Sequence, residues 1–447
     1  MLDFFNKIDT FIWGPPLLIL LVGTGIYLSI RLGLLQIVKL PKALRLIFAD
    51  SEGHGDVSSF AALCTALAAT VGTGNIVGVA TAIKAGGPGA LFWMWMAAFF
   101  GMATKYSEGL LAIRFREKDE NGEIAGGPMY YIVNGLGRNW KWLAILFAIF
   151  GTMTALLGSG TFTQVNSITD SIKNSIGWDP RYVSVVLAIL VAIIIFGGIQ
   201  SISRVSTLVV PFMAVIYVLA GLTILAVNYD KLLPSIGLVF SSAFTGHAAA
   251  GGFIGATVMV ALQKGVARGV FSNESGLGSA PIAAAAAKTE EPVEQGLISM
   301  TGTFIDTIII CTLTGMAIIV TGGWSSNLDG AILTQSAFAS VFGNWGILAL
   351  TVSLVLFAFT TILGWSYYGE RCFEFLFGAK SIPVYRAFFV AMVAIGGFIK
   401  LETIWAIADI VNGLMAFPNL VALLGLSPII LAETKKYFAK SELDLSK

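Results

Sequence analysis

Residues 66–95 read ALAATVGTGNIVGVATAIKAGGPGALFWMW, and this stretch combines two opposed properties. It is apolar enough to cross a bilayer, yet glycines recur at positions 72, 74 and 78, with Thr70, Thr73 and Asn75 among them. Inside a membrane every backbone polar group needs a protein partner, so such a helix is tolerated where the freed backbone lines a cavity. The stretch therefore predicts a broken membrane helix at a binding site, which is typical of transporters.

The composition of the chain indicates a membrane protein. Of its 447 residues 56% are hydrophobic and 12% are charged, with a mean hydropathy of +0.83, whereas about 25% of residues are charged in soluble proteins. No run of Lys and Arg is present, so nucleic acid is not an expected partner. Cys64, Cys311 and Cys372 lie far apart in apolar sequence, and we interpret them as small core residues without a disulfide or a metal.

We expect an all-α polytopic membrane protein with eleven transmembrane helices. A crossing needs about 20 apolar residues. The segments that qualify are 12–33, 59–84, 89–115, 142–176, 182–199, 205–228, 250–287, 296–322, 344–369, 383–400 and 403–432. No soluble region separates them, so residues 1–447 are expected to form one transmembrane domain in the lipid bilayer.

A second glycine-rich and polar interruption lies in the seventh segment, where residues 269–281 read GVFSNESGLGSAP. With 12–33 set aside as a peripheral helix, the two breaks fall in the first helices of two sets of five, 59–228 and 250–432. Because five is odd, the second set starts from the other side of the membrane, which predicts an inverted repeat with a site near the midplane. Small-residue packing faces are the alternative, but two matched polar breaks favour the transport site.

The basic residues indicate the orientation of the chain. If the N-terminus lies outside, 18 of the 27 Lys and Arg residues fall in inner loops or the tail, and six fall in outer loops. Basic residues favour the cytoplasmic side of a membrane. We therefore expect a multi-pass protein of the plasma membrane with its N-terminus outside and its C-terminus in the cytoplasm.

Four motifs resemble those of the alanine or glycine:cation symporter family. They are GGPGALFWMWMAAFFG at 86–101, GGPMYY at 126–131, the stretch 272–287 and GWSYYGE at 364–370. More distantly, Val71–Asn75 resembles the unwound first helix of the bacterial leucine transporter group, which has a five-plus-five inverted repeat. The resemblance implies cation-coupled uptake of small neutral amino acids by alternating access. It implies alanine and glycine as partners and co-transported sodium as the cofactor, and it leaves the oligomeric state open.

The first break offers donors for the carboxylate of an amino acid. N–H groups at the start of a half-helix attract anions, so we expect the amides of Gly74 and Asn75, beside Thr73, to hold the carboxylate. The ammonium group needs acceptors, for which Asn273 and Gln164 are candidates. An ordinary interhelical hydrogen bond is the alternative role for Gln164.

Three aromatic residues are candidate walls of a pocket small enough to select alanine or glycine: Phe162, Phe271 and Trp365. Core packing or contact with lipid is the alternative for each of them.

Thr360 and Thr361 stand together in an otherwise apolar segment. Sodium prefers hard oxygen ligands, and two hydroxyl groups could complete a site with the carbonyl groups of Ala68 and Val71. The resemblance implies that this is the position of the widely shared sodium site of the fold. Alternatively, each hydroxyl donates to a carbonyl of its own helix.

Several charges at membrane depth need a role. Asp306 is an intramembrane carboxylate, and such groups are functional candidates by default; a proton relay, a second cation site and an ion pair all remain open. Glu274 is expected either to accept hydrogen bonds from backbone N–H groups or to pair with Arg268 or Lys264. The leucine transporter group has a gating Arg three residues after the Asn of its first break, but this chain has Gly78 there, so that gate cannot be transferred.

An enzyme is not expected. Only His54 and His247 are present, and both lie near loops, so a buried serine and histidine pair is excluded. The alternatives that stay open are a proton-coupled amino-acid carrier and an ion channel lined by carbonyl and hydroxyl groups.

Overall fold

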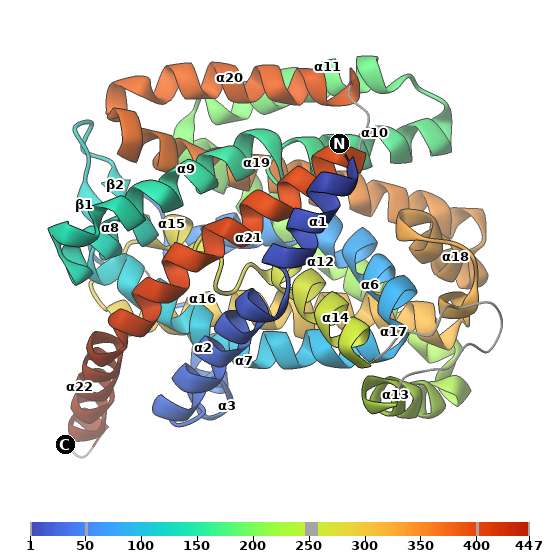
Figure 1. Cartoon of the computed structure of the whole chain (residues 1–447), viewed down its shortest axis with the longest axis horizontal. Coiled ribbons are helices and arrows are strands. Elements are labelled where there is room, and N and C mark those ends of the chain that lie inside the picture. Colours follow the sequence, from blue (N-terminus) through green and yellow to red (C-terminus); the bar gives the residue numbers. More distant parts are fainter. Residues whose placement is uncertain (1, 50–51, 246–257, 399–401, 446–447) are drawn as a thin grey trace.

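The computed structural model describes the chain except for residues 1, 50–51, 246–257, 399–401 and 446–447. The described part is almost entirely helical, with one antiparallel hairpin of β1 (Glu117–Lys118) and β2 (Ile124–Ala125). Figure 1 shows the helices as one bundle, in which the hairpin and α18 (Gly330–Phe342) lie at opposite ends.

The helices of the N-terminal part are α1 (Leu2–Ile12), α2 (Pro15–Arg31), α3 (Leu35–Val38), α4 (Leu40–Leu46), α5 (Ser59–Thr70), the π-helical η1 (Gly74–Gly78), α6 (Val79–Gly86), α7 (Gly89–Arg114), α8 (Pro128–Tyr131), η2 (Ile132–Leu136), η3 (Arg138–Trp140), α9 (Lys141–Leu157), α10 (Phe162–Ile176), α11 (Pro180–Ile195), α12 (Gly198–Val227) and α13 (Tyr229–Phe244). The helices of the C-terminal part are α14 (Val258–Asn273), α15 (Ala280–Ala285), α16 (Pro292–Thr303), the π-helical η4 (Phe304–Cys311), α17 (Thr312–Val320), η5 (Gly323–Ser325), α18, α19 (Asn344–Phe377), η6 (Ala379–Ser381), α20 (Ile382–Ile395), η7 (Gly396–Phe398), α21 (Glu402–Gly425) and α22 (Ser427–Leu445).

The expected all-helical polytopic architecture with broken helices is confirmed. Six helices of the described chain are long and apolar enough to cross a membrane, and the bent pair of α5 with η1 and α6 would make seven. Other expected segments correspond to shorter helices, such as α2 with 17 residues and α11 with 16. The first residues of the expected segment 250–287 lie outside the described residues. The total of eleven spans therefore stays a prediction.

The first break lies between α5 and η1 and bends the pair by 51°. α5 ends at Thr70 because Val71 is extended, with φ −76° and ψ 91°. The side chain of Asn75 replaces a lost helical acceptor, since its Oδ1 accepts a hydrogen bond from the N–H of Gly72 at 2.8 Å. The break is therefore an ordered turn with its own hydrogen bond rather than a frayed helix end.

The second break separates α14 from α15. Glu274 follows α14 in a left-handed conformation with φ 56°, and Gly276 and Gly278 have φ of 86° and 82°. L residues rarely adopt that region, so the two glycines supply what the turn requires. Pro281 then fixes the first turn of α15.

The structure contains a third interruption that the sequence analysis does not predict. The expected segment 142–176 is divided into α9 and α10 at residues 158–161. A Cβ on Gly160 would lie 2.8 Å from the Cβ of Trp365, so this glycine allows α19 to approach the interruption closely.

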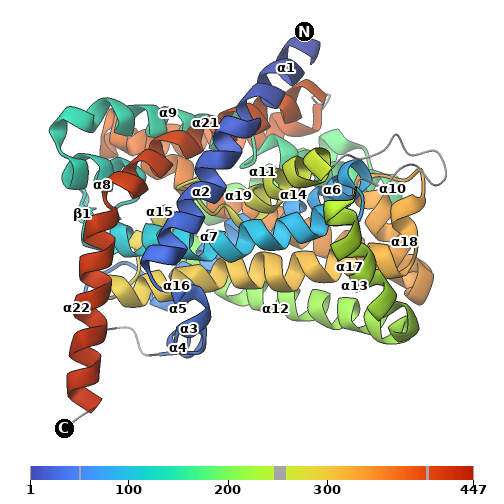
Figure 2. The same ribbon diagram turned by 60° about the horizontal axis from the view of Figure 1, so that its bottom comes forward.

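Both broken helices pack around α7. α7 contacts α14, α15 and α16, and it runs beside α16 in Figure 2. The same view places the N-terminal and C-terminal ends of the chain on opposite sides of the bundle. α6 also contacts α7, and η1 contacts α14, so the two breaks lie next to each other.

Candidate substrate and ion site

Asp306 joins the two breaks. Its Oδ1 accepts a hydrogen bond from Nδ2 of Asn75 at 2.7 Å, and its Oδ2 accepts one from the hydroxyl of Ser272 at 2.9 Å. The hydroxyl of Thr307 donates to Oδ2 at 2.7 Å, and Asp306 is completely buried. One carboxylate in the π-helical segment η4 thus contacts the first break through Asn75 and the second through Ser272. Such π-helical segments are frequent at functional sites.

Buried polar atoms without partners gather beside the first break. Within the described chain, Thr73 Oγ1, Gln164 Oε1 and Ser159 Oγ are buried and have no hydrogen-bond partner. The other end of the Gln164 amide is fixed, because Nε2 donates to the carbonyl of Ser159 at 3.1 Å. Unpartnered buried polar groups are rare in folded proteins, so these atoms are the ones available to a polar ligand.

Gly72 lies where α19 and α10 approach the first break. A Cβ on Gly72 would lie 2.3 Å from Oγ1 of Thr361 and 3.5 Å from Oε1 of Gln164. Gly74 faces the second break, since a Cβ there would lie 3.0 Å from the Cα of Ser272. The structure therefore brings the first break, Gln164 and Thr361 together.

The two threonines of the expected sodium site differ in their surroundings. The hydroxyl of Thr361 lies 2.9 Å from the carbonyl of Phe357 and 3.5 Å from that of Val71. The hydroxyl of Thr360 donates to the carbonyls of Leu356 and Phe357 and lies 3.8 Å from the sulfur of Met213 in α12. Ala68 is fully buried in α5. In this conformation Thr361 contacts the first break and Thr360 contacts α12.

The side-chain amide and the backbone carbonyl of Asn273 form hydrogen bonds that stabilise the second break. Its Nδ2 donates to the hydroxyl of Thr307 at 3.0 Å, its Oδ1 accepts from the N–H of Ser275 at 2.9 Å, and its carbonyl accepts from Nζ of Lys105 at 2.8 Å. Both ends of the side-chain amide are therefore engaged within the protein.

The three candidate aromatic walls occupy different places. Phe271 lines a cavity of about 260 Å³ together with Thr73 and Arg268. Trp365 packs its ring against Tyr368, with the ring centres 5.5 Å apart. Phe162 is buried at the start of α10. Only Phe271 among the three lines this cavity.

Arg268 closes one side of that cavity. Its two terminal nitrogens donate to the two carboxylate oxygens of Asp409 in α21 at 3.2 and 2.9 Å, and its guanidinium lies 5.5 Å from the centre of the Phe271 ring. Of the roles expected for Glu274, pairing with Arg268 is wrong, because Arg268 pairs with Asp409 and Glu274 accepts a hydrogen bond from the hydroxyl of Ser279 at 2.6 Å. Phe271 and Arg268 therefore line the cavity beside Thr73 of the first break, and the ion pair joins α14 to α21.

Arg116 ties the two broken helices together at the other end of the bundle. Its guanidinium donates, at 2.6 to 2.8 Å, to the carbonyls of His54, Ala285, Ala287 and Thr289. Val57, just before α5, forms a parallel β-bridge with Ala287, just after α15. These bonds must break before α5 and α15 can separate.

The β1–β2 hairpin reinforces this closure. Arg371 in α19 is buried and forms ion pairs with Asp119 at 3.1 Å and Glu123 at 2.7 Å, on either side of the hairpin turn. Burial alone would raise the pKa of the Asp119 carboxyl, but hydrogen bonds with Glu374 and the N–H of Glu123, and the charge of Arg371, hold it below its usual range. Asp119 therefore stays ionised at neutral pH and keeps the hairpin bound to α19.

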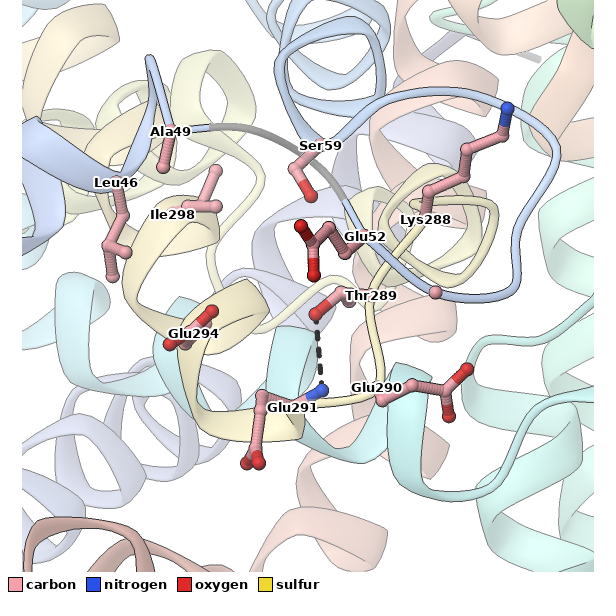
Figure 3. A pocket seen from close by; sticks show the side chains of 11 residues that line it. Leu46, Ala49, Glu52, Ser59, Lys288, Thr289, Glu290, Glu291, Glu294 and Ile298 are labelled. Carbon is pink, nitrogen blue, oxygen red and sulfur yellow. Dashed lines mark hydrogen bonds between the residues drawn. The ribbon is translucent and has the colours of Figure 1, made fainter. Parts of the chain in front are cut away.

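A separate pocket lies on the outside of this closed end. It has a volume of about 430 Å³ and lies between α4, α16 and the segment before α16. Figure 3 shows the side chains of Glu52, Glu290, Glu291 and Glu294 around it, and the N–H of Glu291 donating to the hydroxyl of Thr289. The residues at the two breaks do not line this pocket. It is an acidic hollow on the surface of the closed end.

Comparison with known proteins places the chain in a family. A model of the sodium:alanine symporter family matches residues 1–447. The chain belongs to the sodium:alanine symporter family. It is therefore a transporter with several membrane-spanning helices rather than an enzyme.

Relatives of this symporter family match along nearly the whole chain. The chain is 52% identical over 441 residues to the sodium/alanine symporter AgcS of Methanococcus maripaludis, covering 97% of this chain and 96% of that protein. It is 58% identical over 442 residues to an uncharacterized transporter of Haemophilus influenzae, covering 98% of this chain and 96% of that protein. Both relatives are by name transporters.

The crystal structure of MhsT in complex with L-phenylalanine shares the fold. The superposition has a TM-score of 0.56 at 14% sequence identity and covers 86% of this chain and 99% of MhsT. At that identity the likeness shows the fold alone. The expected relation of this symporter family to the leucine-transporter fold is confirmed.

Sequence reasoning missed two groups of residues at the breaks. Ser272 and Cys311 contact Asn75 or Asp306. Ser272 lies in the stretch 272–287, which is identified from the sequence only as a family motif, and Cys311 is interpreted there as a core residue. Asn419 donates to Glu108 at 2.6 Å and accepts from Tyr131, although it lies more than 140 residues beyond the second break. Polar residues inside apolar helices were the only available signal.

Proposed function

We propose that this protein couples the entry of sodium to the uptake of small neutral amino acids, alanine and glycine, across the plasma membrane by alternating access. The observation that carries the proposal is the group of unpartnered buried atoms, Thr73 Oγ1 and Gln164 Oε1, beside a broken helix whose glycines leave little free space. The relative AgcS is by its name a sodium/alanine symporter.

The proposed substrate site lies at the first break. The backbone N–H groups at Thr73, Gly74 and Asn75 would bind the carboxylate, and Gln164 Oε1 would accept a hydrogen bond from the ammonium group. Asn273 would act through the backbone of the second break, because its side chain is engaged. Phe271, which lines the cavity beside Thr73, would limit the size of the side chain that fits.

The proposed sodium site uses oxygen atoms on either side of the same break. The hydroxyl of Thr361 lies 3.5 Å from the carbonyl of Val71. The carbonyl of Ala68 would add a third ligand, and Thr360 would join them by rotating its side chain away from Met213. All of these ligands are neutral and hard, which suits a monovalent cation. Sodium and substrate would then share one broken helix, which links their binding.

Alternating access needs a closure on each side of the site. We assign the outer closure to Arg268 and Asp409 and the inner closure to Arg116 and the Val57–Ala287 bridge. The repeats 59–228 and 250–432 would move against each other, with 12–33 outside them. The N-terminus would lie outside the cell and the C-terminus inside.

A proton-coupled carrier is the second candidate. The observation that favours it is the buried carboxylate of Asp306, which contacts both breaks and has no basic side chain among its hydrogen-bond partners in the described chain. An ion channel is less well supported, because the described interior is closed at both ends by Arg268 and Arg116.

Uptake of radiolabelled alanine into proteoliposomes tests these proposals. A sodium gradient imposed at equal pH should drive accumulation, and a proton gradient without sodium should not. Accumulation driven by protons alone would replace the first candidate with the second. A sodium flux that does not depend on alanine and that is faster than the uptake of alanine would indicate a channel.

A further inference from the structure

A second, smaller cavity lies beyond the breaks, between the halves of the two broken helices that Arg116 holds together. It has a volume of about 10 Å³ and is bounded by α5, α7, α15 and α16. That is room for about one water-sized particle. Its polar lining consists of Lys105, Glu108, Gln295 and Ser299.

Two of these side chains have an oxygen atom that nothing satisfies. Glu108 is 0% exposed and Gln295 is 1% exposed, and within the described chain Glu108 Oε2 and Gln295 Oε1 have no hydrogen-bond partner. A carboxylate oxygen and an amide oxygen can only accept. The cavity therefore suits an occupant that is positively charged or that donates hydrogen bonds.

The charges around the cavity favour a cation over a neutral molecule. Glu108 lines the cavity, Glu274 and Asp306 are also buried, and the buried Lys105 interacts electrostatically with all three. The ammonium group of Lys105 is bonded to the carbonyl of Asn273, 2.8 Å away. Formal charge is therefore more negative than positive here, and buried charge without compensation is costly.

The chemistry of the ligands points to a monovalent ion. A carboxylate, an amide carbonyl and a hydroxyl are hard oxygen ligands, whereas divalent ions need six or more ligands or retained waters. We infer that Glu108, Gln295 and Ser299 bind a sodium ion in this cavity, separate from the site at Thr361. This inference rests on the proposed function, because it concerns a second coupling ion.

The position of the cavity gives this ion a role in transport. α5 and α15 form opposite walls, and they are the half-helices that the inner closure holds together. An ion bound between them stabilises the closed arrangement. Separation of the two half-helices removes its ligands and releases it toward the Arg116 end of the bundle.

Glu108→Gln tests the site with little disturbance of the fold. A glutamine can keep the bonds that Oε1 accepts from Gly276 N–H, at 3.1 Å, and from Asn419 Nδ2, at 2.6 Å. Its amide nitrogen would replace Oε2 and could donate to Gln295 Oε1. Gln295→Leu removes the second ligand without touching the break. Thr301→Val is the matched control on α16, because the Thr301 hydroxyl donates to its own helix at Ile298.

The measurement is equilibrium binding of radiolabelled sodium to the purified protein, with alanine uptake as the second readout. We expect Glu108→Gln and Gln295→Leu each to bind one sodium ion fewer per protein and to need roughly tenfold more sodium for half-maximal uptake. Thr301→Val should match the wild type in both readouts.

Unchanged sodium binding and unchanged sodium activation in both variants would overturn the inference. If the variants change thermal stability alone, the cavity holds a water molecule, and the inference is overturned. If Glu108→Gln removes the pH dependence of alanine uptake but leaves sodium binding unaltered, Glu108 binds a proton, and the inference is again overturned. Failure of the proposed function is distinguishable, since wild-type protein would then bind sodium without sodium-driven uptake of alanine.

Discussion

The amide nitrogen of Asn75 lies 2.7 Å from Oδ1 of Asp306, across 231 residues of sequence. The same Asn75 side chain accepts from the N–H of Gly72, so it connects the unwound backbone of the first break directly to a buried carboxylate. Because Ser272 binds the other oxygen of Asp306, a change at either break reaches the other through one residue. This connection is the physical link on which coupling between ion and substrate would depend.

Asp306→Asn should weaken this connection. The asparagine retains one acceptor oxygen but places an NH₂ group where Asn75 or Ser272 now donates, which leaves a buried donor unsatisfied at a cost of about 1–3 kcal/mol. We expect a lower melting temperature and slower alanine uptake. Thermal unfolding and uptake by the same preparation measure both, and wild-type values in both would contradict the assigned role.

Thr361→Val should reduce the apparent affinity for sodium. The substitution preserves shape and removes the hydroxyl that lies 3.5 Å from the Val71 carbonyl. Loss of one neutral ligand should raise the sodium concentration for half-maximal uptake by about tenfold, or about 1.4 kcal/mol. Thr360→Val should have a smaller effect because its hydroxyl lies beside Met213. If sodium activates uptake equally in the wild type and in Thr361→Val, Thr361 is not a ligand of the sodium ion.

The pair of Arg268 and Asp409 should behave as one unit. Removing either partner leaves a partly buried charge unpaired, so Arg268→Gln and Asp409→Asn should each slow uptake. In a double-mutant cycle the combined variant should be less impaired than the sum of the two, with a coupling energy of about 0.5–3 kcal/mol. Additive effects on the rate of uptake would show that the pair does not act as a closure.

Phe271→Ala should widen the range of substrates. Phe271 lines the cavity beside Thr73, so its removal should admit valine and leucine as competitors of labelled alanine. Each methylene of altered fit is worth about 1–3 kcal/mol. Trp365→Ala is the comparison, and it should mainly lower stability, because Trp365 is buried and packs against Tyr368. An unaltered order of competitors in Phe271→Ala would place the selectivity elsewhere.

The helical architecture and both breaks were predictable because they depend on local sequence. Glycines beside small polar residues at 72–75 and 273–279 have no stable continuous helix in a membrane, whatever surrounds them. The interruption at 158–161 is not predictable from local sequence because its cause is tertiary. Gly160 has no side chain, which allows Trp365 of α19 to pack close to it.

The partners of the polar residues were less predictable. Asp306 was recognisable as an intramembrane carboxylate, but its bonds to Asn75 and Ser272 depend on how three helices pack. The pairing of Arg268 with Asp409, 141 residues away, replaced the expected pairing with Glu274 for the same reason. Spacing along one helix shows which residues share a face and not which helix lies opposite.

The central claim is that alanine and sodium bind together at the first break, and Gly72→Ala tests it most directly. The new Cβ would lie 2.3 Å from Oγ1 of Thr361, whereas Gly23→Ala in α2 meets nothing within 4 Å and serves as the control. Sodium-gradient-driven accumulation of labelled alanine in proteoliposomes is the measurement. We predict that Gly72→Ala abolishes accumulation while Gly23→Ala retains the wild-type rate; sodium-driven accumulation at the wild-type rate by Gly72→Ala would contradict the account.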